Sequence, residues 1–120
     1  MISAPKKLES LSKRAEFLAV ASSGMRWVAP GFVLQVGGEH PPLPCPRFGL
    51  TATKKIGNAV TRNRARRRLR ALAHQILPQA STSHDYVLIA RVGTTACSFS
   101  DLKNDLQKGL KRLKLWEEHR

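Results

Sequence analysis

Apolar residues recur along the chain with two different periods, and segments of the two kinds alternate. Apolar positions three and four residues apart predict helices at residues 8–23, 58–77 and 98–113. Short runs rich in β-branched and aromatic residues predict strands at residues 32–36, 47–53 and 85–92. A serine, Ser98 or Ser100, is expected to cap the last helix. The expected order is therefore α-β-β-α-β-α, with room for one further strand.

These elements predict the fold class. The strand at residues 85–92 is apolar almost throughout, which is typical of a central strand covered on both faces. We expect a single α+β domain over residues 1–120, a small α-β sandwich in which helices pack on a central sheet of about four strands. Residues 1–7 are expected to form a loose basic arm, and residues 116–120 a frayed tail.

Composition narrows the function to binding a polyanion. The chain has 120 residues, of which 42% are apolar, and a net charge of +13. That is enough apolar surface for one core, and the charge favours a nucleic acid as partner. No apolar run approaches the ~20 residues that a membrane span needs. Two isolated cysteines and the lack of a secretory leader lead us to expect a reduced, cytoplasmic protein without a membrane partner.

The most informative segment is the start of the second predicted helix. Six arginines lie within the nine residues from Arg62 to Arg70. Between His40 and His84 there are nine Lys or Arg and no acidic residue, so the sequence nearby does not neutralise this charge. Planar guanidinium groups bind phosphates through paired hydrogen bonds. We therefore expect this helix to contact the phosphates of a partner.

Helical geometry separates the two sides of this helix. At about 100° per residue, the side turned away from the apolar stripe carries Asn63, Arg67, Arg70 and His74. Arg62 falls on the flank of the stripe, and we expect the first turns to project past the core and leave it exposed. Lys54, Lys55 and Asn58 come just before the helix, where its free N–H groups attract phosphate. The spacing GxxxxGK[ST] is absent, which indicates a polyanion surface and not a nucleotide pocket.

The sequence offers no catalytic centre on the protein. Phosphodiester hydrolysis usually requires clustered carboxylates that bind metal ions, or paired histidines. The eight acidic residues form no convincing cluster, and the four histidines show no ligand spacing. Asp101 and Asp105 suit the first turns of a helix without any metal. We expect no catalytic residue and no metal site on this chain.

Three functions remain open at this level. The residues suit a binding subunit that positions RNA, or a ribosomal or general RNA-packaging protein without a nuclease role. A DNA-binding regulator would need a helix-turn-helix or a dimerisation pattern, and neither is present.

One family resembles the chain over nearly its whole length. The run FGLTATKKIGNAVTRNRARRRLR at residues 48–70 resembles the signature of the bacterial ribonuclease P protein component, which combines Lys-Lys-x-Gly-x-Ala-Val with Arg-Asn-Arg. The resemblance continues in LSKRAEF at 11–17, FVLQV at 32–36 and HDYVLIAR at 84–91.

This resemblance implies both a fold and a function. The basic helix would join two parallel strands by a left-handed crossover, an exception to the usual rule. The protein would assist a catalytic RNA in an endoribonuclease holoenzyme, with one protein per RNA. The holoenzyme would hydrolyse precursor tRNA to leave a mature 5′ end, with Mg²⁺ held mainly by the RNA.

The resemblance also assigns residues. The family motif that contacts the catalytic RNA is matched by Lys54, Lys55, Asn58, Arg62, Asn63, Arg64, Arg66, Arg67 and Arg68. The exposed helix face adds Arg70 to these candidates. The single-stranded 5′ leader would lie in a cleft between the first helix and the sheet, for which the candidates are Phe17, Phe32, Leu34 and Gln35. Along the strand, Gln35 points to the opposite face from Phe32 and Leu34, so only one of these faces can line the cleft. Ala21 and Gln35 stand where aromatic residues are expected in many relatives, which predicts weaker stacking on the leader.

Overall fold

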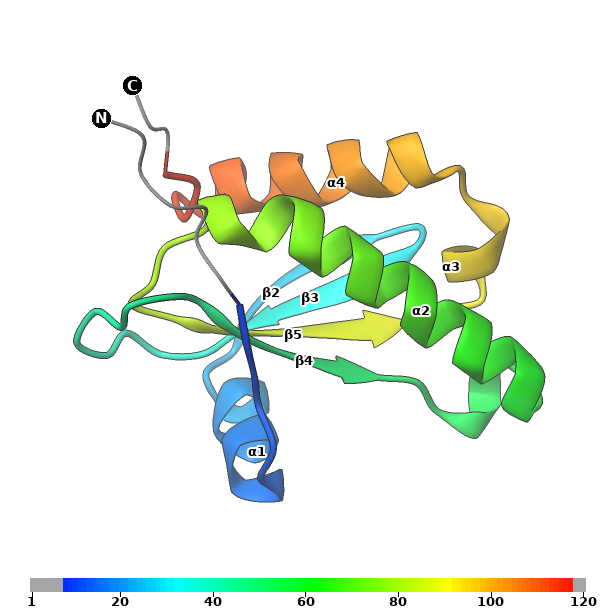
Figure 1. Ribbon diagram of the computed structural model, residues 1–120, viewed down its shortest axis with the longest axis horizontal. Helices are drawn as coiled ribbons and strands as arrows, with labels where there is room; N and C mark the ends of the chain where they lie inside the picture. Colours follow the sequence, from blue (N-terminus) through cyan, green and yellow to red (C-terminus); the bar gives the residue numbers. More distant parts are fainter. Residues whose placement is uncertain (1–7, 118–120) are drawn as a thin grey trace.

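The computed structural model describes residues 8–117 and has a mixed α+β fold with an open sheet. In chain order the elements are β1 (Glu9–Ser10), α1 (Arg14–Ser22), β2 (Met25–Ala29), β3 (Phe32–Val36), β4 (Arg47–Thr51), a 3-10 turn (Lys54–Ile56), α2 (Ala59–Ile76), a second 3-10 turn (Leu77–Gln79), β5 (Asp85–Ala90), α3 (Gly93–Ala96) and α4 (Phe99–Arg112). The five strands lie in the order β1-β4-β5-β3-β2. Helices α2 and α4 cover one face of the sheet, and α1 lies on the other (Figure 1).

The centre of the sheet combines parallel and antiparallel pairing. Strand β5 pairs with β4 in parallel and with β3 antiparallel, as a central strand must. Because α2 connects β4 to β5, the basic helix joins two neighbouring parallel strands, as the resemblance implied. Both the α+β class and the central place of β5 are confirmed.

The main core lies between the sheet and the pair α2 and α4. Strand β3 sends Phe32, Leu34 and Val36 into it, and all three are fully buried. The facing side chains from the two helices are Ala65, Leu69, Leu72, Ala73, Ile76, Leu102, Leu106 and Leu110. Removing such a fully buried leucine from water stabilises the fold by ~1.5–3 kcal/mol, so this layer fixes the position of α2 firmly.

The opposite face of the sheet is only partly covered. Helix α1 packs there through a smaller cluster that contains Val20 and Val87, with Phe17 and Ile89 against it. Val28 belongs to the same face, because it pairs with Val33 across β2 and β3, and it is 54% exposed. One end of this face therefore stays open beside α1.

Several boundaries differ from the prediction. The first helix begins at Arg14 and not at residue 8, because Glu9–Ser10 pairs with β4 through Glu9 N–H to the Pro46 carbonyl at 3.0 Å. Strand β2, at Met25–Ala29, is an edge strand that the pattern did not reveal.

The predicted tail is ordered at its start. Trp116 bridges to Ala80, and the N–H of Glu117 donates to the Gln79 carbonyl at 2.7 Å, so fraying at these two positions was wrong. The arm at residues 1–7 and the last three residues, 118–120, lie outside the described part of the chain. Within that part, no helix has the length and apolar character needed to cross a membrane.

Candidate nucleic-acid interface

The start of α2 is built by a local cap. Asn58 precedes the helix in an extended conformation, and its side-chain oxygen accepts a hydrogen bond from the Thr61 N–H at 3.0 Å. Gly57 has φ 140°, a value that a residue with a side chain would rarely adopt. The preceding turn leaves Lys54 and Lys55 exposed. Two lysines thus stand beside the positive end of the helix dipole, where an anion is favoured.

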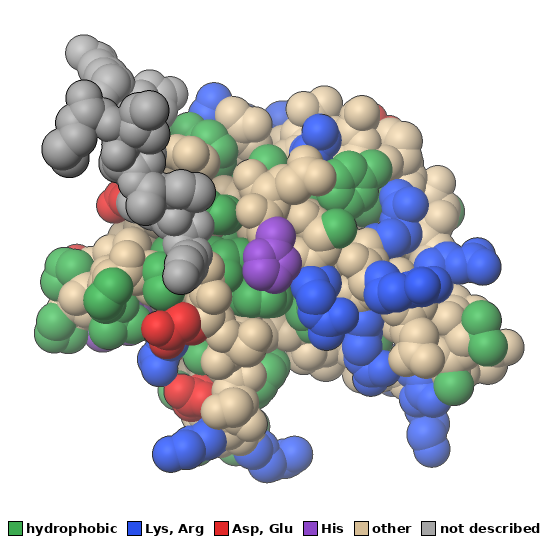
Figure 2. Space-filling view, in the orientation of Figure 1, with side chains coloured by type: hydrophobic (Ala, Val, Ile, Leu, Met, Phe, Trp, Pro, Cys, Tyr) green, Lys and Arg blue, Asp and Glu red, His purple; other side chains and the backbone are tan. Residues whose placement is uncertain are grey.

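The outer face of α2 presents uncompensated positive charge. Arg67 and Arg70 are exposed, together with Asn63 and His74, as helical geometry predicted, and Arg64 is exposed as well. Among residues 8–117, no acidic side chain forms an ion pair with an arginine of α2. Figure 2 shows Lys and Arg side chains gathered over α2, while the acidic side chains visible on this face lie outside that cluster. The charge is therefore available to a partner.

Two arginines of the motif point inward instead. Arg68 donates from Nε to the Thr94 carbonyl at 2.9 Å and from Nη2 to the Cys97 carbonyl at 2.5 Å. Its guanidinium fixes α3 against α2, and we remove it from the phosphate-binding candidates. Arg62 was expected to be exposed, but it is half-buried, and its Nε is buried without a hydrogen-bond partner within the described chain. Residues 59–64 of α2 include no buried residue, so the first turns do project past the core as predicted, although Arg62 is not left fully exposed.

Arg66 and Arg70 connect the outer face of α2 to the other side of β4. With Asn63 and Arg67 they line a hollow of about 530 Å³ on α2, and they also border a groove of about 260 Å³ that reaches Phe17 on α1. Arg66 is held in place by hydrogen bonds to Asn63 Oδ1 at 3.2 Å and to the Ala52 carbonyl at 3.5 Å. The basic surface thus continues around the sheet edge to α1.

The groove beside α1 is shaped by a glycine. The Phe17 ring lies against the backbone of β4, and a Cβ atom at position 49 would lie 2.4 Å from Cε1 of that ring. Gly49 therefore allows the Phe17 ring to pack directly on the strand. Phe17 remains half-buried, so part of its ring is accessible from the groove.

The structure decides which face of β3 meets α1. Phe32 and Leu34 are 0% exposed in the core under α2 and α4, so their assignment to a leader cleft on the α1 side was wrong. Gln35 is half-buried and pairs with Val87, which is in the cluster under α1. Residues that the sequence analysis missed complete this open face: Val28, Val33 and Ile89. The alternation along β3 predicted two faces, but it did not indicate which helices would cover each face.

An ion-pair network fixes α1 to the sheet, and the sequence analysis did not anticipate it. Arg47 on β4 donates to both carboxylate oxygens of Asp85 on β5, at 2.9 and 2.6 Å, and to Glu16 on α1 at 3.1 Å. The other oxygen of Glu16 accepts from the N–H groups of Ser12 and Lys13, at 3.0 and 2.9 Å. Such bidentate, charge-assisted contacts hold both partners in a defined geometry.

Hydrogen bonding shifts the acidity of this network. The backbone N–H groups of Lys13 and Ser12 hold the pKa of Glu16 below its usual value, and Arg47 adds to the effect. The hydrogen bond with Asp85 raises the pKa of Arg47. His40 Nε2 lies 3.2 Å from Asp85 Oδ1, the oxygen that also accepts from Arg47 Nε. Glu16 and Arg47 are therefore both charged at neutral pH, and their contact holds α1 against β4.

The described residues do not assemble a metal site. No three of their His, Cys, Asp or Glu side chains come together in a way that could hold an ion. What the geometry can do is bind phosphates on α2 and accommodate an extended chain beside Phe17. These features are typical of a protein that binds a nucleic acid through its phosphates.

Comparison with known proteins names the family. The sequence model of the ribonuclease P family matches residues 6–114. A ribonuclease P protein component of Paramagnetospirillum magneticum is 45% identical over 111 residues, 89% of this chain and 84% of that protein. One from Gluconacetobacter diazotrophicus is 47% identical over 103 residues, 85% of this chain and 88% of that protein.

Solved structures agree with this result. A Staphylococcus aureus RNase P protein mutant with defective mRNA degradation activity superimposes with a TM-score of 0.73 at 25% identity, over 89% of both chains. The RNase P protein of Thermotoga maritima has the same fold, with a TM-score of 0.71 at 24% identity over 87% of this chain and 96% of that one.

The chain belongs to the ribonuclease P protein family. It is the protein subunit of the ribonuclease P holoenzyme, an endoribonuclease of tRNA 5′ processing, and its partner is ribonuclease P RNA. This assignment takes the place of the RNA-packaging alternative.

Proposed function

We propose that the exposed face of α2, together with Lys54 and Lys55, binds phosphates of the catalytic RNA, and that the open sheet face beside α1 holds the 5′ leader of precursor tRNA. One protein would act with one RNA, in the cytoplasm. The observation that supports this proposal most directly is that Arg64, Arg67 and Arg70 are exposed and form no ion pair with an acid among residues 8–117. When such guanidinium groups neutralise RNA phosphates, the counterions condensed on the RNA are released, which makes binding favourable and dependent on salt.

The leader side of the proposal is supported by shape and chemistry. The open face has an apolar floor of Val28, Val33 and Ile89, and the half-buried Phe17 forms one wall. Single-stranded bases stack on accessible aromatic rings at ~1–3 kcal/mol each, whereas phosphates favour the basic rim at Arg66 and Arg70. The groove that Phe17 lines together with Arg66 and Arg70 places this ring beside the basic rim. An extended strand would thus place bases on the floor and its backbone toward α2.

The affinity of the protein for the leader is expected to be modest. Phe17 is the single aromatic side chain of the described residues in this groove that is left partly accessible, since Phe48 is buried. Ala21 is exposed on α1 and offers no ring, and Gln35 offers hydrogen bonds instead of stacking. We expect this protein to discriminate a precursor from a mature tRNA by about tenfold, the gain from a single stacked base.

Hydrolysis itself is assigned to the RNA. Mg²⁺ would be held mainly by that partner, because the described protein residues offer no ligand cluster, and no step is assigned to a protein-bound metal. The role of the chain is to neutralise phosphates where the two RNAs converge, which lowers the repulsion between them. Lower repulsion reduces the concentration of free Mg²⁺ needed to bring them together.

Cleavage of precursor tRNA by the reconstituted holoenzyme at different Mg²⁺ concentrations tests this role. Replacing Arg64 and Arg67 by Ala should raise the Mg²⁺ concentration for half-maximal cleavage severalfold. The matched control removes the same charge from α1, at the exposed Lys13 and Arg14, and should stay near the wild-type value. An unchanged Mg²⁺ requirement in the α2 variant, or an equal rise in both, would refute the electrostatic role.

A further inference from the structure

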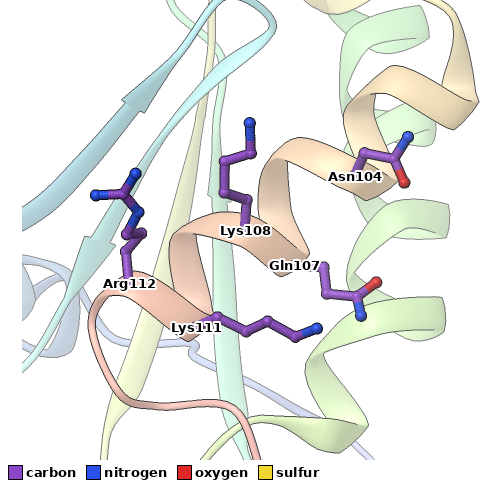
Figure 3. Close-up of a pocket in the computed structure, with 5 residues that line it drawn as sticks. All are labelled: Asn104, Gln107, Lys108, Lys111 and Arg112. Atoms are coloured by element: carbon purple, nitrogen blue, oxygen red, sulfur yellow. The ribbon is translucent and has the colours of Figure 1, made fainter.

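Helix α4 carries a second basic surface that the family motif does not include. Its outward stripe consists of Asn104, Gln107, Lys108, Lys111 and Arg112, which together line a shallow pocket of about 510 Å³. Figure 3 shows that Gln107 and Lys111 point toward α2, whereas Lys108 and Arg112 extend on the other side of the helix. The stripe therefore offers three cations and two amide groups to one partner.

The cations of this stripe, Lys108, Lys111 and Arg112, form no ion pair with an acidic residue among residues 8–117. Within this range, Asp105, one turn before Lys108, does not reach it. Lys108 and Arg112 stand four residues apart on the helix, a spacing at which like charges repel. The helix dipole favours cations in the last turn, which accounts for Lys111 and Arg112 but less for Lys108.

The surface rests on a rigid support. Gly109 on the inner side of α4 lets the Trp27 ring approach so closely that a Cβ atom there would lie 2.5 Å from the ring's Cδ1. At the end of the helix, Lys111 Nζ lies 5.8 Å from the centre of the Trp116 ring, and Trp116 is itself bridged to Ala80. An ordered support reduces the entropy lost on binding.

The position of the stripe separates it from both surfaces already described. Helices α2 and α4 run side by side in the same direction on one face of the sheet (Figure 1). The arginines of α2 lie between residues 62 and 70, within the first two-thirds of that helix, whereas the cations of the stripe lie in the second half of α4. The proposed leader face is on the opposite side of the sheet. A single short segment of RNA on α2 would therefore not cover the α4 stripe.

We infer that the α4 stripe binds the phosphate backbone of a second segment of the same ribonuclease P RNA. The cations neutralise phosphates, and the amides of Asn104 and Gln107 can hydrogen-bond phosphate or ribose oxygens without reading base sequence. The protein would then bridge two segments of its RNA partner. The inference depends on the proposed function only for the phosphate contacts of α2.

Equilibrium binding of the protein to ribonuclease P RNA without substrate tests the inference. Replacing Lys108 and Arg112 by Ala should weaken binding about fivefold or more near 0.15 M salt. The slope of log affinity against log salt concentration should become shallower by about the amount expected for two lost phosphate contacts. The control variant with Lys13 and Arg14 replaced by Ala loses the same charge from the other side of the sheet and should bind within about twofold of wild type. Exchanging the two cations, Lys108→Arg with Arg112→Lys, should keep nearly full affinity.

Combination with an α2 variant makes the two proposals separable. If the sites are independent, the losses from the α4 pair and from Arg64→Ala with Arg67→Ala should multiply. Wild-type affinity in the α4 variant, or an equal loss in the α1 control, would overturn the inference and leave the role of α2 intact. Wild-type affinity in the α2 variant would instead refute the proposed function. A loss in the α4 variant confined to precursor tRNA with a leader would also overturn the inference.

Discussion

The Phe17 ring on α1 packs directly on Gly49 of β4, so closely that a Cβ atom would lie 2.4 Å from the ring. This contact links the helix that carries the accessible ring to the strand that leads into the basic turn. A side chain at position 49 would displace the ring, because β4 is held on one side by β5 and on the other by β1. The open face beside α1 and the basic surface of α2 are thus both positioned by strand β4.

Gly49→Ala should therefore alter the leader groove more than the fold. We expect the free energy of unfolding to fall by about 1–3 kcal/mol, the usual cost of inserting a methyl group into packed surroundings. The preference of the holoenzyme for precursor over mature tRNA should fall toward that of Phe17→Ala. Binding to ribonuclease P RNA alone serves as the control and should not change. A variant that keeps the full preference would contradict the role of the ring.

Two neighbouring arginines of α2 should behave in opposite ways. Arg68→Ala removes two charge-assisted hydrogen bonds to carbonyls near α3 and should lower the free energy of unfolding by about 2 kcal/mol. Arg67→Ala removes an exposed side chain and should change stability by less than ~0.5 kcal/mol while weakening binding to the RNA. Denaturant unfolding and RNA binding of the two variants provide the comparison. Equal stability of both would show that Arg68 does not anchor α3.

The capping carboxylate of α1 should make stability depend on pH. Because the pKa of Glu16 in the folded protein lies below its usual value of 4.5, ionised Glu16 stabilises the fold above that pH. The contribution is lost as the pH falls through the lower, folded pKa. Urea unfolding of wild type and Glu16→Gln should therefore differ at neutral pH and converge below pH 4.5. A difference that is constant over this range would mean that the charge of Glu16 is not what holds α1.

The core position of Phe32 separates it from Phe17. Phe32→Ala should lower the free energy of unfolding by about 3–5 kcal/mol, since it opens a cavity under α2 and α4. Phe17→Ala should cost less, because its ring is half-buried, and should specifically reduce the preference for a leader. Measuring both quantities in both variants tests the assignment of the two faces. A selective loss of leader binding in a folded Phe32→Leu variant would contradict it.

Local signals explain what was predictable. The expected range 58–77 for the basic helix agrees with Ala59–Ile76 because the Asn58 cap, the apolar stripe and Pro78 are all encoded within one segment. Ser98 likewise caps α4 by accepting from the Asp101 N–H at 3.1 Å. The exposure of Arg67 and Arg70 followed from helical geometry alone.

Tertiary contacts explain what was not predictable. The inward turn of Arg68 depends on where α3 lies, and the short pairing of Glu9–Ser10 depends on β4, which is distant in sequence. The alternation along β3 identified two faces, but only the packing of α2 and α4 shows that Phe32 belongs to the core. The ion-pair network of Arg47 joins β4 to α1 and β5, and no sequence motif predicts it.

The salt dependence of binding between this protein and ribonuclease P RNA tests the central claim most directly. Each phosphate contact contributes to the slope of log affinity against log salt concentration, so replacing Arg64, Arg67 and Arg70 by Ala should make that slope shallower by about 2 to 3. Affinity should fall while thermal unfolding stays near that of wild type, because all three side chains are exposed. An unchanged slope and affinity in a folded variant would show that the outer face of α2 does not contact the RNA.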